Sequence, residues 1–279
     1  MSIKKISEST SRQIRLLALD VDGTLFTSNH EISEASRTAI RAATAGGIRV
    51  VLASGRGPRA LRSILGQLGM EGHAIAFSGG MLCTLGHKPV DSIRVIYERQ
   101  LNLATAQGIM DSALARGFSV AWCVGETWHI RAWDDLLQRE AQHAGMPIFT
   151  HLPKEPPHKI QCMAASAEQA RELLRFRNEL PPDCIGMFSN ESYLEIYPEG
   201  VSKALGLQQL GELLGIGLNE MAAIGDGEND VAMLREVGLG IAMGQAAPHI
   251  QQAADWVTAS NNQEGVAAAI EQMQREGRM

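Results

Sequence analysis

The chain lacks the features that mark several large classes of protein. Its four cysteines are scattered and form no C-x-x-C pair, which argues against a zinc knuckle or a thiol redox motif. It has no long basic run and a net charge of −6, so a nucleic-acid backbone is not expected as a partner. No apolar run could span a bilayer, and the polar N-terminus lacks the apolar stretch of a signal peptide. These absences predict a cytoplasmic protein that binds neither nucleic acid nor membrane.

What the chain does have is an alternation of strand-like and helix-like segments in its first and last thirds. Short, nearly continuous apolar runs predict buried strands at residues 15–20, 48–54, 73–77, 221–225 and 239–243. Segments with helical patterning lie between them. Strands of this kind, separated by helices, are typical of a parallel sheet whose two faces are both covered. The fold class expected is therefore α/β, with a Rossmann-like parallel sheet core.

The middle of the chain has a different pattern, with aromatic hairpin-like segments, a proline-rich linker and only scattered helices. This pattern predicts an α+β module inserted between the two halves of the α/β core. The expected division is a flexible tail at 1–13, a core made of 14–82 and 193–279, and an inserted module at 83–192.

The run LLALDVDGTLF at residues 16–26 places two acids directly behind a predicted strand. Asp20 and Asp22 are two residues apart, so on an extended chain both side chains project the same way. Paired carboxylates at the open edge of a sheet can supply a nucleophile, a proton carrier and ligands for a hard cation. The competing interpretation is an ordinary surface turn, because Asp-Gly favours turns.

Three further polar stretches stand at the ends of predicted elements. Ser54-Gly55 follows the second strand and could form a phosphate-binding concavity, although Ser-Gly is also a common turn. Lys203 opens a predicted helix, where an ammonium and backbone N–H groups together suit a phosphate; alternatively it is a solvated surface lysine. The loop GDGEND at 225–230 offers oxygen ligands for Mg²⁺, or else a simple acidic helix cap. Its spacing does not match an EF-hand.

Taken together, these stretches resemble the motif set of the haloacid dehalogenase-like superfamily. More narrowly, the chain is similar to the Cof-type sugar-phosphate phosphatases, which carry an inserted α+β cap domain of class two, B type. The resemblance rests on DVDGTL (20–25), ASGR (53–56), EGVSKALGL (199–207) and GDGENDVAML (225–234).

The resemblance implies a Mg²⁺-dependent phosphatase that forms an aspartyl-phosphate. Asp20 would attack phosphorus, and Asp22 would protonate the leaving alcohol and then deprotonate the attacking water. Mg²⁺ would be held by the Asp20 carboxylate, the Asp22 backbone carbonyl and the Asp226 carboxylate. The substrate implied is a small phosphorylated metabolite, in particular a sugar phosphate, and the protein is expected to be a monomer or weak dimer.

The resemblance also assigns the residues around the phosphoryl group. Its oxygens would be held by Ser54, Gly55, Lys203 and Asn229, although Asn229 could instead contact a metal-bound water. Asp230 and Thr24 would not contact the substrate but would hydrogen-bond to the groups that do. Asp230 in particular would orient Lys203 or a water.

Two features leave alternatives open. Ser78 stands where the family commonly has asparagine, so a substrate contact there is in question. The inserted module carries distinctive side chains that either line the substrate pocket or simply pack: Trp122, Trp128, His129, Arg131 and Trp133.

The same scaffold could also serve a phosphotransferase or phosphomutase, or a non-catalytic protein that binds phosphorylated metabolites.

Overall fold

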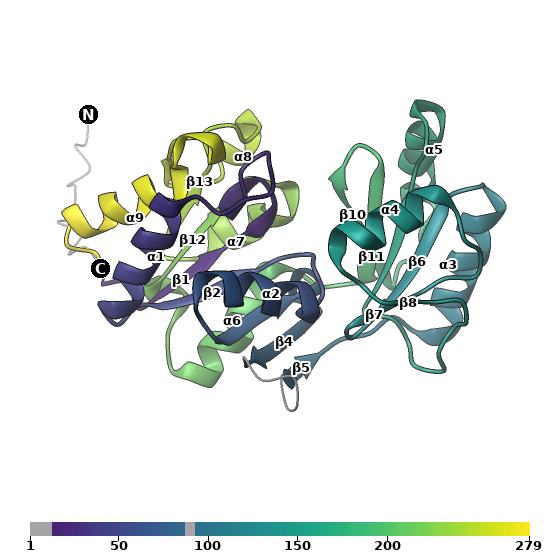
Figure 1. Cartoon of the computed structure of the whole chain (residues 1–279), viewed down its shortest axis with the longest axis horizontal. Coiled ribbons are helices and arrows are strands. Elements are labelled where there is room, and N and C mark those ends of the chain that lie inside the picture. Colours follow the sequence, from purple (N-terminus) through teal and green to yellow (C-terminus); the bar gives the residue numbers. More distant parts are fainter. Residues whose placement is uncertain (1–12, 87–92) are drawn as a thin grey trace, which may run out of the picture.

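The computed structural model describes residues 13–86 and 93–279, so the tail expected at 1–13 lies almost wholly outside the described residues. The described chain forms two lobes, each built on its own sheet (Figure 1). No helix within these residues is long and apolar enough to cross a membrane.

The first lobe is built on an eight-stranded sheet. Its central strands run parallel, as expected, and a two-stranded antiparallel extension completes one edge. Across the sheet the order is β14 (Trp256–Val257), β13 (Leu239–Ala242), β12 (Met221–Gly225), β1 (Leu16–Leu19), β2 (Arg49–Ala53), β3 (Gly72–Ala76), β4 (Met81–Leu85) and β5 (Ile93–Glu98).

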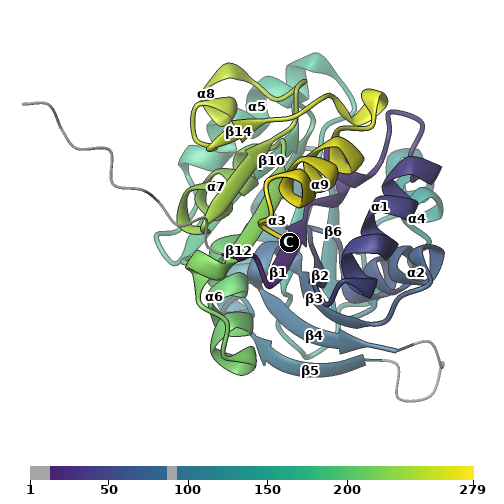
Figure 2. The same ribbon diagram turned by 90° about the vertical axis from the view of Figure 1, so that its left-hand side faces the viewer.

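Helices cover both faces of the parallel part, which explains why its strands are apolar throughout. In β1 the side chains of Leu17 and Leu19 join one core cluster, whereas Leu16 and Ala18 join the other. The first cluster is covered by α1 (Glu34–Ala45), α2 (Pro58–Leu68) and α9 (Gly265–Arg275). The second is covered by α6 (Lys203–Leu214), α7 (Val231–Glu236) and α8 (Pro248–Gln251). Figure 2 shows α1, α2 and α9 on one side of the sheet and α6 and α7 on the other.

The second lobe is built on a six-stranded, mainly antiparallel sheet. Its strands, in order, are β10 (Cys184–Asn190), β11 (Tyr193–Pro198), β9 (Lys159–Met163), β6 (Ser119–Val124), β7 (Thr127–His129) and β8 (Ile148–Phe149). Helices α3 (Leu103–Ala115) and α5 (Ala167–Asn178) pack on one face through the cluster that contains Trp122. Helix α4 (Asp135–Ala144) packs on the opposite face through Leu137 and Ala141.

The chain changes sheet later than the boundaries expected at 82/83 and 192/193. Strand β4 pairs with β3 and β5 pairs with β4 in the first sheet, and β11 pairs with β9 and β10 in the second. The first difference arises because Met81–Leu85 is an apolar strand that turns straight back onto β3, so Met81, Cys83 and Leu85 join the first core cluster and Leu82 joins the second. The chain passes to the second sheet after Glu98 and returns after Pro198.

Candidate active site

The polar stretches singled out in the sequence meet at one edge of the first sheet. Asp20 follows β1, Ser54 follows β2 and Asp226 follows β12, and β1 pairs in parallel with both neighbours. The carboxyl ends of these strands lie side by side, which is where open parallel sheets bind their ligands. Lys203 reaches the same edge from the first turn of α6, for which Ser202 is the N-cap.

A buried lysine joins two carboxylates at the centre of this edge. The Lys203 Nζ donates to Asp20 Oδ1 at 2.5 Å and to Asp230 Oδ1 at 2.6 Å. Lys203 and Asp230 are fully buried, and Asp20 is 5% exposed. The other oxygen of Asp230 accepts hydrogen bonds from the backbone N–H groups of Asp226 and Gly227, at 3.0 and 2.9 Å. Asp230 therefore has both oxygens engaged and fixes Lys203 against Asp20.

Burial and repulsion raise the pKa values of two acids in this cluster. Burial and the charge of Asp230 raise the pKa of Asp20 well above its usual range, and Lys203 offsets this only in part. Burial also raises the pKa of Asp226, despite its hydrogen bond from Thr24. Burial alone would lower the pKa of Lys203, but Asp20 and Asp230 hold it above its ordinary value. Three carboxyl groups thus share a single ammonium group in this cluster.

The residues present fit a divalent cation. Carboxylate oxygens of Asp20, Asp226 and Asp230 all lie within 4.8 Å of one another. Oxygen ligands suit Mg²⁺, and a bound cation would offset the burial and the repulsion from Asp230 that raise the pKa values of Asp20 and Asp226. Because Asp230 already binds Lys203 and two backbone N–H groups, Asp20 and Asp226 are the carboxylates better placed to hold the ion.

Asp22 is held by Arg56, a residue for which the sequence analysis predicts no role. Arg56 donates from Nε and from its terminal nitrogen to the two Asp22 oxygens, at 2.8 and 2.6 Å. Burial would raise the pKa of Asp22, but the hydrogen bonds and charge of Arg56 hold it below its ordinary value. The Arg56 guanidinium also lies over the Phe26 ring, 5.5 Å from its centroid. Arg56 stands in the ASGR motif, but nothing in the sequence indicated which acid it would bind.

The turn after β1 brings Asp226 close to the backbone of residue 23. The Thr24 hydroxyl donates to Asp226 Oδ1 at 2.7 Å, and Gln245 donates to the Gly23 carbonyl at 2.6 Å. Gly23 has a φ of +82°, and a Cβ at this position would overlap the Asp226 carboxylate. Only glycine permits both the left-handed turn and this close approach.

Replacing Gly23 with alanine is therefore expected to displace Asp226 and to reduce catalytic activity by about 10²-fold, the usual cost of misplacing a catalytic group by about 1 Å. Gly69→Ala is the matched control, because Gly69 also has a positive φ, +71°, but has open space around its Cβ position. Both variants should lose stability in thermal unfolding, Gly23→Ala more than Gly69→Ala because of its overlap with Asp226, and only Gly23→Ala should lose activity. Equal activity in both would show that the Asp226 position does not matter.

The remaining expected phosphate-binding residues lie at the same edge. Ser54 is 2% exposed, and its hydroxyl oxygen accepts from the Arg56 N–H at 3.2 Å. Gly55 is half-buried beside it. Asn229 is half-buried within the single helical turn Glu228–Asp230 that precedes α7.

Most of the distinctive side chains of the second lobe pack or pair. Trp122 is fully buried in the cluster under α3 and α5, and Trp128 and His129 are each 7% exposed. Arg131 forms an ion pair with Asp111. Trp133 is 54% exposed. Of the two interpretations that the sequence left open, packing is the one that the structure supports for Trp122, Trp128 and His129.

Comparison with known proteins identifies the group to which this arrangement belongs. The family model described as haloacid dehalogenase-like hydrolase matches residues 17–270. A Haemophilus influenzae protein whose name is a provisional phosphatase assignment is 31% identical, over 91% of this chain and 95% of its own. The crystal structure of a haloacid dehalogenase-like hydrolase from Bacteroides thetaiotaomicron is 30% identical, with a TM-score of 0.82, over 94% of this chain and 100% of its own. A structure described as a subclass IIB sugar phosphatase shares the fold at 22% identity and a TM-score of 0.78, over 95% of this chain and 100% of its own.

Proposed function

We propose that this protein hydrolyses small phosphomonoesters with the aid of Mg²⁺. The chain belongs to the haloacid dehalogenase-like hydrolase family and is, as a member of that family, a phosphoric monoester hydrolase. The class of substrate we propose is a sugar phosphate or a similar phosphorylated metabolite. The observation that carries the proposal is the buried Lys203, which holds a carboxylate, Asp20, beside a second potential metal ligand, Asp226.

In the proposed reaction an Asp20 oxygen attacks phosphorus, the ester P–O bond breaks, and an aspartyl-phosphate forms. A water then attacks phosphorus and releases inorganic phosphate, which regenerates the carboxylate. Lys203 neutralises the charge that would otherwise repel a carboxylate from an anionic phosphoryl group. Ser54, the Gly55 backbone and Asn229 bind the phosphoryl oxygens, and Asp230 and Thr24 hold Lys203 and Asp226 in place.

Asp22 moves the protons in this scheme. It gives a proton to the leaving alcohol and takes one from the attacking water. The ion pair with Arg56 favours its ionised form, which is the form that accepts a proton. For the first step Asp22 must therefore take up a proton, and a phosphoryl group that competes for Arg56 would assist this by weakening the ion pair.

The ligands we propose for Mg²⁺ are the carboxylates of Asp20 and Asp226 and the backbone carbonyl of Asp22. When bound, the ion supplies positive charge that stabilises the phosphoryl transition state. The chain's own residues position the Asp226 carboxylate, because Thr24 donates a hydrogen bond to it and Gly23, which has no Cβ, leaves room for it.

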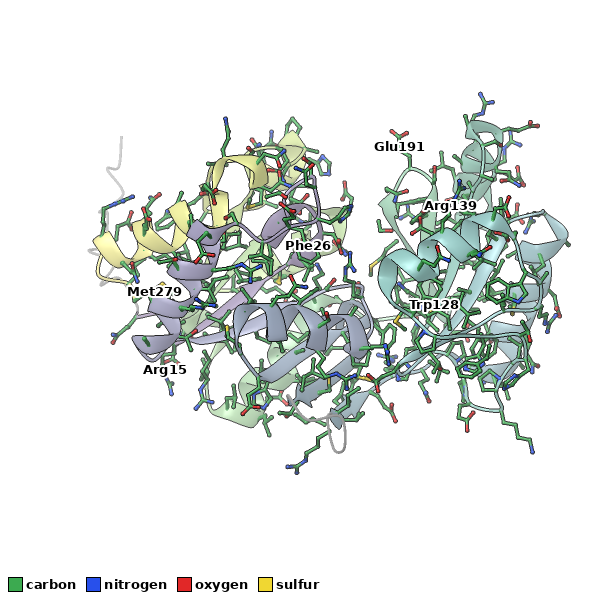
Figure 3. The ribbon with its side chains drawn as sticks, viewed as in Figure 1. Arg15, Phe26, Trp128, Arg139, Glu191 and Met279 are labelled. Carbon is green, nitrogen blue, oxygen red and sulfur yellow. The ribbon has the colours of Figure 1, made fainter. Side chains whose placement is uncertain are left out.

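The second lobe is proposed to act as a cap that selects the leaving group. Strand β10 lies next to the helical turn Glu228–Asp230 of the site. Figure 3 shows Phe26, over whose ring Arg56 lies, on the side of the first lobe that faces Arg139 and Glu191 of the second. A small substrate bound at Asp20 would have its leaving group between these surfaces. Closure of such a cap excludes water from the reaction.

Removal of divalent cations tests this proposal. Hydrolysis of an aryl phosphate is expected to fall by about 10²-fold or more after chelation and to return with Mg²⁺, because a metal ion contributes several kcal/mol to such a transition state. Mg²⁺ at one hundred times its Kd should also stabilise the folded protein by about 2.7 kcal/mol, measured by thermal unfolding. Asp226→Asn should abolish most of that stabilisation. Full activity in chelator, or phosphate transfer only to an added alcohol, would contradict hydrolysis by this route.

A further inference from the structure

A network of buried polar side chains connects the second sheet to the first beside the proposed phosphate-binding loop, residues 54–56. The network consists of Lys159, Glu195, Tyr197 and Ser78. Lys159 Nζ donates to Glu195 Oε1 at 2.7 Å, and the Tyr197 hydroxyl donates to Glu195 Oε2 at 2.6 Å. The Ser78 hydroxyl lies 3.2 Å from the Tyr197 hydroxyl. All four side chains are less than 10% exposed, and the reaction proposed above uses none of them.

These side chains enclose one residue of the phosphate-binding loop, Gly55. A Cβ on Gly55 would lie 2.7 Å from Glu195 Oε2 and 3.1 Å from the Tyr197 hydroxyl oxygen. The second sheet therefore contacts the loop so closely that a side chain at residue 55 would force the network apart. Burying an ion pair at such a place costs desolvation energy, so its position calls for a physical explanation.

The network reaches the Ser54 hydroxyl through a single peptide unit. Lys159 Nζ also donates to the Gly55 carbonyl at 3.1 Å. The N–H of the same peptide unit belongs to Arg56, and it donates to Ser54 Oγ at 3.2 Å. A serine hydroxyl has one hydrogen to donate and two sites at which it accepts. With an acceptor site taken by Arg56, the hydroxyl hydrogen remains available for a phosphoryl oxygen.

We propose that Lys159 is a positioning residue for Ser54: its ammonium fixes and polarises the Gly55–Arg56 peptide, which in turn orients the Ser54 hydroxyl toward the phosphoryl group. A cation on the carbonyl strengthens the N–H at the other end of the same peptide, since linked hydrogen bonds polarise one another. The inference rests on the proposed function, in which Ser54 binds the phosphoryl oxygens.

The other side of the loop is held by the same network. Phe77 and Ser78 are consecutive non-glycine residues with positive φ, +50° and +54°, a conformation that persists only where surrounding contacts enforce it. The Ser78 N–H donates to the Ser54 carbonyl at 2.9 Å, while the Ser78 hydroxyl contacts Tyr197. Ser78, which stands where the family commonly has asparagine, thus links the loop to the second sheet. A shift of the second sheet would therefore move Tyr197 and Ser78, and through the Ser78 N–H it would move the Ser54 backbone.

A double-mutant cycle with Ser54→Ala tests this assignment. The paired substitution Lys159→Met/Glu195→Gln removes both buried charges together, so that neither is left unpaired, and Tyr197→Phe is a milder second variant. We expect kcat/KM for an aryl phosphate with Mg²⁺ to fall by about 10- to 10²-fold in the paired variant and by about 5-fold in Tyr197→Phe. In the Ser54→Ala background each substitution should cost less than about twofold, because the group through which it acts is gone.

The affinity for orthophosphate, measured by calorimetry in the presence of Mg²⁺, should follow the same pattern. Lys154→Met, at an exposed lysine of the preceding linker, is the matched control and should leave both measurements unchanged. Losses of equal size in both backgrounds, or no loss in either, would overturn the inference. If the wild-type protein bound phosphate but hydrolysed no ester, the proposed function would fail and the calorimetric cycle would still decide the role of Lys159.

Discussion

Asp20→Asn is expected to reduce phosphoester hydrolysis by at least about 10⁴-fold, the scale of loss seen when a nucleophile or its essential partner is removed. The amide has nearly the same shape as the carboxylate but cannot attack phosphorus. The folded protein should change in stability by no more than about 1 kcal/mol. The reason is that two effects oppose each other: the substitution loses the charged contact with Lys203 but removes the repulsion between Asp20 and Asp230.

Initial rates and thermal unfolding of the same preparations measure the two quantities. Asp111→Asn is the matched control, since Asp111 lies on α3 of the second lobe, has a largely exposed side chain and pairs with Arg131. It should retain full activity. An Asp20→Asn enzyme that still released phosphate at a substantial rate would show that a different group attacks phosphorus.

Lys203→Met is expected to cost stability and activity together. Lys203 is fully buried, and its removal would leave Asp20 and Asp230 as unpaired carboxylates a short distance apart. Breaking a buried ion pair from one side typically costs about 3–5 kcal/mol. Catalysis should be lost as well, because no ammonium would remain to offset the charge of the phosphoryl group. Urea unfolding at neutral pH without divalent cations gives the change in stability.

The double variant Lys203→Met/Asp230→Asn separates the two effects. Removing one carboxylate should recover a large part of the lost stability, and the asparagine oxygen can still accept from the N–H groups of Asp226 and Gly227. Activity should not recover. A Lys203→Met protein as stable as the wild type, or a double variant that regains hydrolysis, would contradict this account of the site.

The core of the site could be predicted from the sequence because parallel strands end at a common edge. Asp20, Ser54 and Asp226 follow three neighbouring strands, so their meeting follows from the strand order. Thr24 lies in the turn after β1, and Asp230 lies four residues after Asp226, so both reach the same edge with the strands that they follow. The contacts of Thr24 with Asp226 and of Asp230 with Lys203 join distant parts of the chain, and they form because the sheet, whose pattern is plain in the sequence, brings the strand ends together.

The contacts between the lobes could not be predicted in the same way. The sequence places Lys159 at the end of the predicted proline-rich linker and Glu195 in the predicted second half of the core, and only the meeting of the two sheets brings both against Gly55. Arg56 belongs to a recognisable motif, but its pairing with Asp22 depends on side-chain directions across two loops. The sheet change after Glu98 differs from the boundary expected at 82/83 because β4 continues the first sheet in an antiparallel direction, whereas the apolar pattern of the core predicts parallel strands.

The close fit around Gly55 limits how freely the insertion can be exchanged. A chimaera that took residues 99–198 from a relative would replace Lys159, Glu195 and Tyr197 together while leaving Ser54, Gly55 and Ser78 behind. Such a graft would bring the donor's leaving-group specificity, but the donor's side chains would not match Gly55 and Ser78 where the two lobes meet. Substrate range in this scaffold should therefore be altered by point changes on the facing surface of the second lobe rather than by transplanting the lobe whole, unless the donor carries the same three side chains.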